Sequence, residues 1–314
     1  MKKETKLGLI FAIFSNIFGG IQPVIANSRP IYLDAHIFSG MTALIQLIIF
    51  IPIFLIEGWF QKKKIKNLTI DLENAPKGKK LYFGQSKYYL FVIVGVMFSL
   101  VMFLYYSGLE LAGSINGTLA LKSTAFFGLL FGYLILKEKI SKIQILFSCI
   151  LFIGMAVAIT EGAFYLLKLN LGVILILICS CIWMIGHTCS KPYLHHRITT
   201  SSELLIWRNI FTFIILIGLY LLIYGPYQMF TIIFEPLNIY FYIIGGLFYG
   251  VNVFCWYQII KYLDVSISTI LITPQIIITA FFSSIFLGEN FTIFHLIGLI
   301  IILISIFFIS KFKK

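Results

Sequence analysis

A single lysine lies deep inside one of the long apolar runs of this sequence. Lys122 stands about nine residues into the run over 114–136. A lysine near the centre of a bilayer costs about 2.5–3.5 kcal/mol on insertion scales, so such residues usually face a cavity or a polar partner. Carboxylates occur only at the ends of the runs, as at Glu110 and Asp264. We therefore expect Lys122 to face a central cavity and attract a carboxylate or phosphate; a snorkelling lysine is the structural alternative.

Threonines at helical spacing extend this expectation. Thr118 lies four residues before Lys122, so the two share one helix face. Thr269 and Thr273 repeat that spacing in the run over 266–288. We expect these four residues to line opposite walls of one cavity that carries a single positive charge.

Aromatic residues form a second pattern. Tyr249, Asn252 and Trp256 stand at i, i+3 and i+7, and thus on one helix face; Phe98 and Tyr105 give a similar face to the run over 88–110. Aromatic rows can hold an apolar or aromatic solute, and packing against neighbouring helices or lipid is the alternative.

Further polar residues lie inside other apolar runs. Trp183 and His187 share a face of one run, Asn16 lies in the first run, and Gln275 directly follows Pro274. An imidazole could carry a proton, because its ordinary pKa is near 6.5. We favour instead a His187 that is hydrogen-bonded to a neighbouring helix, since no carboxylate lies at mid-membrane depth.

Three charged residues are interpreted as structural. Arg208 lies about two turns into its run, toward the expected cytoplasmic face, where a long side chain can snorkel to the surface. Glu138 and Glu289 each follow an apolar run, and this repetition fits capping of the helix that comes next in the chain.

The elements that must position these residues are membrane-spanning helices. Hydrophobic residues make up 60% of the 314 residues and charged residues only 11%, whereas soluble chains carry roughly 25% charged residues. A span needs about 20 apolar residues. The runs predict ten spans, or nine if the last two are one; they lie at 7–27, 35–57, 88–110, 114–136, 142–161, 169–190, 201–224, 239–262, 266–288 and 292–311. The first is too long for the apolar core of a signal peptide.

The distribution of Lys and Arg predicts the orientation. A lysine-rich segment over 58–87 is expected to be a cytoplasmic loop, solvated from Gln61 onward. If the N-terminus is cytoplasmic, only Arg29 and Lys168 of the 24 Lys and Arg residues fall in outside segments. This asymmetry follows the positive-inside rule. It predicts a multi-pass protein of the cell (inner or plasma) membrane, with both termini cytoplasmic.

The chain contains an internal repeat. At an offset of 151 residues Tyr106 falls on Tyr257 and Glu138 on Glu289, and "LGLIFAIFSNIFGG" from residue 7 aligns with "LGVILILICSCIWM" from residue 171. Each half holds five spans, so the second half enters the membrane inverted, as in many secondary transporters. We predict an all-α membrane protein of two inverted five-helix repeats, 1–162 and 163–314.

These features resemble the drug/metabolite transporter superfamily, with two EamA-type domains. The resemblance is carried by "LKEKIS" and "LGENFT" after the fourth and ninth runs, and by Gly154, Gly298, Pro274 and Arg208. It implies an inverted-repeat transporter, and it leaves the substrate open among amino acids, drugs, sugars, nucleotide sugars and phosphorylated metabolites. The chain departs from the family pattern at Thr42, Ser123, Phe147 and Ser305.

Other functional classes lack their motifs. The sequence has no P-loop for ATP, no nucleophile–base pair at membrane depth and no Cys/His metal spacing, so neither an enzyme, a metal site nor a cofactor is predicted. An intramembrane enzyme or a channel is the distant alternative. The expected function is export of a small organic solute such as an amino acid; export of cationic or aromatic drugs is the main alternative. The expected partners are this solute and the lipid bilayer, not nucleic acid, and a homodimer is left open.

Overall fold

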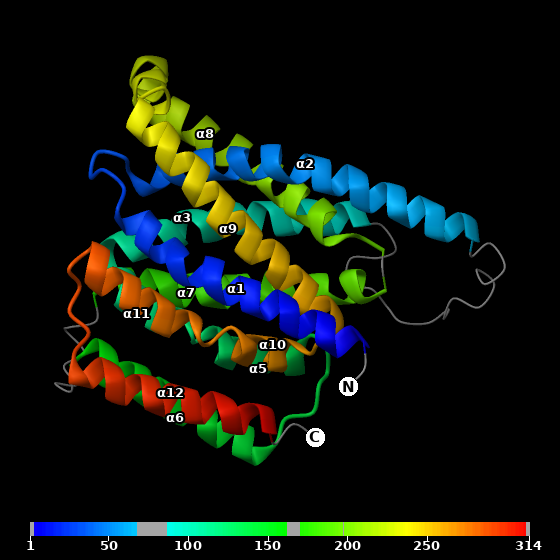
Figure 1. Ribbon diagram of the computed structural model, residues 1–314, viewed down its shortest axis with the longest axis vertical. Coiled ribbons are helices and arrows are strands. Elements are labelled where there is room, and N and C mark those ends of the chain that lie inside the picture. The colour runs from blue at the N-terminus through cyan, green and yellow to red at the C-terminus, as the bar shows by residue number, and fades with distance from the viewer. Residues whose placement is uncertain (1–2, 68–86, 162–169, 197, 312–314) are drawn as a thin grey trace.

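The computed structural model describes residues 3–67, 87–161, 170–196 and 198–311, and every regular element in them is a helix (Figure 1). The helices are α1 (Lys3–Asn27), α2 (Ala35–Asn67), α3 (Lys87–Ala112), α4 (Ser114–Leu121), α5 (Thr124–Leu134), α6 (Lys142–Ile159), α7 (Leu171–His195), α8 (Ser201–Ile233), α9 (Pro236–Tyr262), α10 (Val265–Leu271), α11 (Gln275–Phe286) and α12 (Ile293–Lys311).

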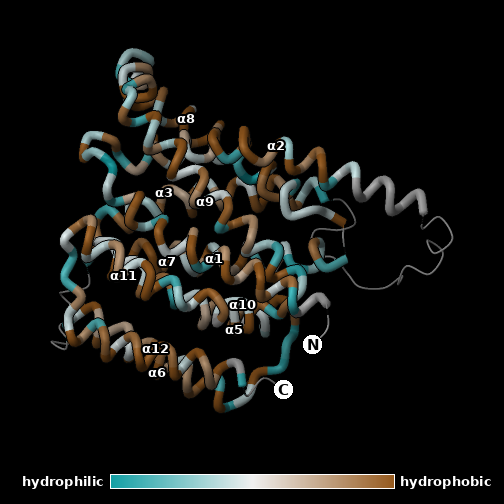
Figure 2. The backbone as a smooth tube through the Cα atoms, viewed as in Figure 1, coloured by the Kyte–Doolittle hydropathy of each residue, from teal (hydrophilic) through white to brown (hydrophobic). Residues whose placement is uncertain are grey.

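Eight helical segments are long and apolar enough to cross a membrane, when α4 and α5 are taken together as Ser114–Leu134. Gln275–Phe286 and Ile293–Ile309 are apolar but shorter. Hydrophobic residues run along the helices, whereas hydrophilic ones gather mostly at helix ends and connections (Figure 2). The chain is therefore a multi-pass membrane protein, and the count of ten spans stays a prediction.

Two helices are longer than the apolar runs indicate. Helix α2 continues to Asn67, so the expectation of a solvated loop from Gln61 is wrong for its first residues. Lysine is a good helix former, so the helix extends beyond its apolar part. Helix α8 continues to Ile233 across a non-helical residue, Gly225. The remainder of the lysine-rich segment, 68–86, lies outside the described residues.

Each long helix packs mainly against a helix of the other half. Helix α1 lies against α9, α3 against α7, α2 against α8, and α6 against α12. Exchanging the halves converts the α1–α9 pair into the α7–α3 pair, and the remaining two pairs into themselves. This pattern is that of a pseudo-twofold axis between two inverted repeats. Helix α1 begins and α12 ends at the same end of the bundle (Figure 1).

The α6–α12 pair lies at one edge of the bundle (Figure 1). Its helices approach closely where Gly154 faces Gly298. A Cβ added to Gly298 would lie 2.5 Å from the carbonyl oxygen of Gly154. Small residues at such a crossing let two backbones come together, and here both halves supply one.

Glu289 caps a helix of the opposite half. Its carboxylate accepts the backbone N–H groups of Ser114 at 2.7 Å and Ile115 at 2.8 Å, at the start of α4. The expectation that the repeated glutamates cap the next helix in the chain is thus wrong for Glu289. It does not hold for Glu138 either, because α6 is capped by a capping box of Ser141 and Gln144. Both glutamates follow a broken span, and tertiary packing decides which helix end Glu289 reaches.

Candidate substrate site

The site is built around two broken helices. The first break separates α4 from α5, where Lys122 and Ser123 make i→i−3 backbone bonds of 3.0 Å to Leu119 and Ala120. The second separates α10 from α11 at Pro274, which lacks an N–H and so frees carbonyl groups of the preceding turn. Broken backbone at membrane depth is tolerated where it is enclosed by protein or lines a cavity.

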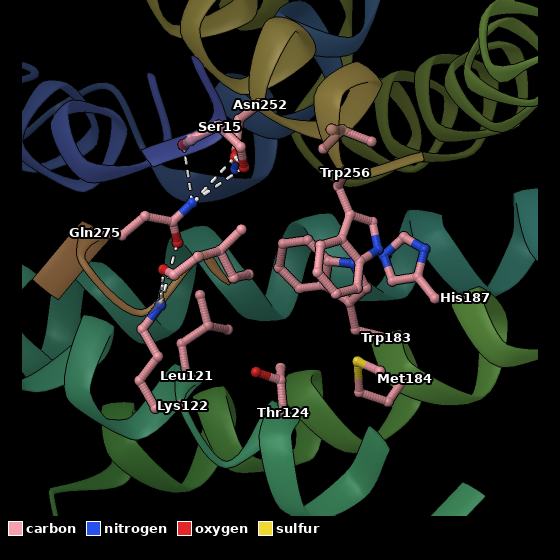
Figure 3. A pocket seen from close by; sticks show the side chains of 12 residues that line it. Ser15, Leu121, Lys122, Thr124, Trp183, Met184, His187, Asn252, Trp256 and Gln275 are labelled. Atoms are coloured by element: carbon pink, nitrogen blue, oxygen red, sulfur yellow. Dashed lines mark hydrogen bonds between the residues drawn. The ribbon is translucent and has the colours of Figure 1, made fainter. Parts of the chain in front are cut away.

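Lys122 bridges the two breaks. Its ammonium donates to the carbonyl oxygen of Ile272 at 3.0 Å and to Oε1 of Gln275 at 3.2 Å (Figure 3). The side chain is 2% exposed. Both acceptors are neutral, and no carboxylate of the described residues lies within ion-pair distance of it. A buried ammonium with only neutral partners favours an additional anionic partner.

The Lys122 cavity, as we call the pocket beside this ammonium, is formed by α1, α5, α7, α9 and the two breaks. Its lining residues are Ser15, Leu121, Lys122, Thr124, Trp183, Met184, His187, Asn252, Val253, Trp256, Ile272 and Gln275. Its volume of about 40 Å³ accommodates no more than a few water molecules. The cavity in this conformation is therefore too small for an organic solute, which can bind only after the helices separate.

One wall is a network of neutral polar groups. Gln275 donates from Nε2 to the backbone oxygen of Ser15 at 2.9 Å and to Oδ1 of Asn252 at 3.2 Å. The hydroxyl of Ser15 donates to the same oxygen of Asn252 at 2.7 Å. This network joins α1, α9 and α11 and, through Gln275, fixes one acceptor of Lys122 (Figure 3).

The opposite wall is aromatic. The His187 ring lies 5.7 Å from Trp183 and 5.5 Å from Trp256, between ring centroids (Figure 3). Both His187 nitrogens and Nε1 of Trp256 are buried without a hydrogen-bond partner among the described residues. His187 therefore makes no hydrogen bond to a neighbouring helix among the described residues, contrary to expectation, because aromatic rings surround the imidazole.

The structure brings together half of the residues that the sequence singled out. The cavity is lined by Lys122, Trp183, His187, Asn252, Trp256 and Gln275. The structure places six others away from its lining: Asn16, Tyr105, Thr118, Tyr249, Thr269 and Thr273.

Of the four helix-spaced residues expected to line one cavity, only Lys122 lies on the lining of the Lys122 cavity in this conformation. Lys122 is the C-cap residue of α4, which ends at Leu121. Thr273 donates instead to the backbone oxygen of Thr269 at 3.1 Å.

The other three residues make polar or aromatic contacts nearby. Asn16 donates to the carbonyl oxygen of Leu271 at 2.7 Å. The hydroxyl of Tyr105 donates to Oε1 of Gln22 at 2.5 Å, and its ring lies 5.7 Å from that of Tyr249. These contacts surround the cavity but do not form its surface.

Six lining residues were not anticipated: Ser15, Leu121, Thr124, Met184, Val253 and Ile272. Apolar residues give no sequence signal of this kind. Ser15 on α1 contacts Asn252 on α9 and Gln275 on α11. To identify it from the sequence, one would have to know that these three helices touch.

Arg208 also differs from its expected position. It is 0% exposed and is among the largest fully buried side chains, so it does not snorkel to the membrane surface. The sequence shows the depth of a residue in a span but not the direction in which its side chain points.

Comparison with known proteins identifies the fold and family. A family model described as the EamA-like transporter family matches residues 6–160 and again 170–311. The chain belongs to this family. Its two matches coincide with the two repeats, and family membership makes the protein a membrane transporter of small solutes. EamA-like transporters are a class of transporters, not of enzymes.

A solved structure titled "Crystal structure of protein" is similar over 98% of this chain and 97% of its own, with a TM-score of 0.68 and 12% sequence identity. Identity this low supports the fold alone. No curated protein matches the chain.

Proposed function

We propose that this EamA-like transporter is a secondary exporter of a small organic solute, such as an amino acid or a related metabolite, and that Lys122 holds an anionic group of that solute. The observation that carries the proposal is the buried ammonium at the junction of the two broken helices. It has two neutral acceptors and borders the Lys122 cavity. A carboxylate or phosphate would supply the missing negative charge.

Transport then requires the small cavity to widen and to open alternately to the two sides. The pseudo-twofold packing gives the bundle two equivalent ways to separate its pairs of helices, one toward each membrane face. In our proposal both termini are cytoplasmic and the protein resides in the plasma membrane. Lysine and arginine placement supports this orientation. Binding of the solute by Lys122 competes with its bonds to Ile272 and Gln275, which links solute occupancy to the contact between the breaks.

A second candidate is export of aromatic cations. The indoles of Trp183 and Trp256 on the cavity wall favour it, because aromatic faces attract cations. The Lys122 ammonium opposes it by repulsion. The two candidates therefore differ in their response to removal of a single charge.

The test compares purified wild type with Lys122→Gln, and uses Lys139→Gln as control because that lysine is exposed and does not line the cavity. Thermal shifts are measured with amino acids, organic acids, phosphorylated metabolites and aromatic cations. A ligand at 100 times its Kd stabilises by about 2.7 kcal/mol. Losing a charge-assisted hydrogen bond of about 1.5–3 kcal/mol weakens binding about 10- to 150-fold.

Anionic or zwitterionic solutes that stabilise wild type and Lys139→Gln but not Lys122→Gln support the proposal. Stabilisation of all three proteins by the same solutes would assign Lys122 a structural role. Tighter binding of cations to Lys122→Gln would favour the aromatic-cation candidate. Uptake of the best ligand by inside-out and right-side-out proteoliposomes then gives the direction of transport.

A further inference from the structure

A second buried cation lies close to the Lys122 cavity. The guanidinium of Arg208 in α8 lies 4.5 Å from the ring centroid of Phe98 and 5.4 Å from that of Tyr249. Its one well-aligned hydrogen bond to the described residues is a weak contact of 3.7 Å from Nη2 to the sulfur of Met102. Nε and Nη1 have no aligned acceptor, although the hydroxyls of Tyr249 and Tyr257 lie near enough to interact with the guanidinium. No described carboxylate pairs with the group.

The groups around Arg208 also have unused hydrogen-bonding capacity. The hydroxyls of Tyr249 and Tyr257 and both nitrogens of His187 are buried without an aligned partner. The tyrosine hydroxyls and the imidazole all lie within electrostatic range of the guanidinium. We call Arg208, His187, Tyr249 and Tyr257 the Arg208 cluster. Each unsatisfied buried group costs about 1–3 kcal/mol, and an isolated buried charge costs more.

Cation–π contact with Phe98 and Tyr249 compensates only part of this cost. Such contacts contribute about 2 kcal/mol when desolvated. They leave the N–H groups at the edge of the guanidinium plane with neutral tyrosine hydroxyls beside them and no anionic acceptor among the described residues. The cluster therefore has donors in excess, and an anion of planar, two-oxygen geometry is the partner that suits a guanidinium best.

The corresponding place in the first half is hydrogen-bonded, and the buried cation near it, Arg29, is already paired with Glu110. Tyr106 is the repeat equivalent of Tyr257, and its hydroxyl accepts from Nε2 of Gln22 at 3.2 Å. Oε1 of Gln22 in turn accepts from Tyr105 at 2.5 Å. At this place the described residues of the first half have no buried cation without a carboxylate partner, so the fold itself does not require one there. The difference between the halves points to a ligand.

His187 connects the cluster with the Lys122 cavity. Its ring borders the cavity, and it lies 5.0 Å from Phe98 and 5.2 Å from Tyr257. Phe98 thus contacts both the His187 ring and the guanidinium of Arg208. An opening of the helices that moves the Phe98 ring would join the two cationic places into one site.

We infer that the Arg208 cluster is a second anion subsite, so that the transported solute carries two acidic groups, one held by Lys122 and one by Arg208. This inference rests on the proposed function. Each cation lacks a carboxylate partner among the described residues, so a solute with two carboxylates neutralises both charges on binding. Short dicarboxylates and acidic amino acids have this chemistry.

The experiment uses probe pairs that differ by one carboxylate. Succinate is compared with its monoamide, and glutamate with glutamine, by thermal shift and calorimetric titration of the purified protein. The variants are Arg208→Gln, Arg208→Lys and Tyr257→Phe. Arg29→Gln is the matched control, because Arg29 is a buried arginine that is already ion-paired with Glu110.

We expect wild type and Arg29→Gln to bind the diacid of at least one pair about tenfold or more tightly than its amide. Arg208→Gln abolishes this ratio while the amide still binds through Lys122. Arg208→Lys keeps part of the diacid-to-amide affinity ratio, since it keeps the positive charge but loses the paired N–H donors of the guanidinium. Tyr257→Phe lowers the affinity for the diacid more than the affinity for the amide, because its hydroxyl lies beside the guanidinium of Arg208.

Equal binding of diacid and amide by wild type would overturn the inference. The inference would also be overturned if Arg208→Gln melted at a lower temperature than wild type but kept the same ratio of diacid to amide affinity. If Arg208→Gln does not fold, an unchanged ratio in Arg208→Lys and Tyr257→Phe has the same meaning. In each of these cases amide binding that still depends on Lys122 leaves the proposed function standing, whereas loss of that dependence removes the proposed function itself.

Discussion

The cap that Glu289 places on α4 makes a sharp stability prediction. Glu289→Gln keeps the shape of the side chain but removes its charge. The amide oxygen can accept from one of the two N–H groups of Ser114 and Ile115, and the amide nitrogen then faces the other. The N-cap residue, Gly113, supplies no side-chain cap of its own. The substitution therefore leaves one helix-terminal donor without an acceptor.

The expected loss is about 2 kcal/mol, the upper end of the range for removal of a helix cap. Loss of the carboxylate from the positive end of the helix dipole lies within this figure. For a chain of 314 residues, 1 kcal/mol corresponds to roughly 1.5 °C, so the melting temperature should fall by about 3 °C. Fluorescence-detected melting in one detergent at a fixed heating rate measures this fall.

Glu235→Gln is the matched control. Glu235 occupies the N-cap position of α9, but its side chain makes no capping hydrogen bond. Its substitution should change stability by no more than about 0.5 kcal/mol. If the melting temperatures of Glu289→Gln and Glu235→Gln differ by less than about 1 °C, the cap contributes nothing measurable to stability and the reasoning fails.

Two glycine positions give further predictions. Gly298→Val should destabilise the protein by about 1–3 kcal/mol, because its Cβ would meet the backbone of Gly154. Gly218 has open space around it, so Gly218→Ala should be close to neutral. The melting temperatures of the two variants test this contrast. Gly113→Ala should cost about 1–3 kcal/mol, since its φ of 81° and ψ of 165° belong to a region that glycine alone adopts readily. A melting temperature of Gly113→Ala that lies within about 1 °C of the wild-type value would show that this backbone relaxes freely.

The sequence predicted those features that depend on local composition. Apolar runs gave the long helices, because a bilayer demands about 20 apolar residues for each crossing. The offset between the halves gave the inverted repeat, which the family match confirms. The burial of Lys122 also followed from its depth in a run without carboxylates.

Features that depend on distant contacts could not be predicted. The break at Lys122 has no proline, since Ser123 stands at that position, and the lysine is held by Ile272, 150 residues away. Arg208 was assigned to the surface because its aromatic partners, Phe98 and Tyr249, lie on other spans. In each case the deciding neighbour is unknown until the helices are packed.

The pairing of helices between the halves has a consequence for biogenesis. Helix α1 is the first to enter the membrane, yet Ser15 donates to Asn252, which is synthesised 237 residues later, and Asn16 donates to Leu271, 255 residues later. At about 5–20 residues per second, these polar groups wait roughly 10–50 s for their partners. During that time the early helices must be held by the insertion machinery, by water or by one another. A chain that stops before α9 would leave them unpaired, which makes the N-terminal half a natural target for membrane quality control.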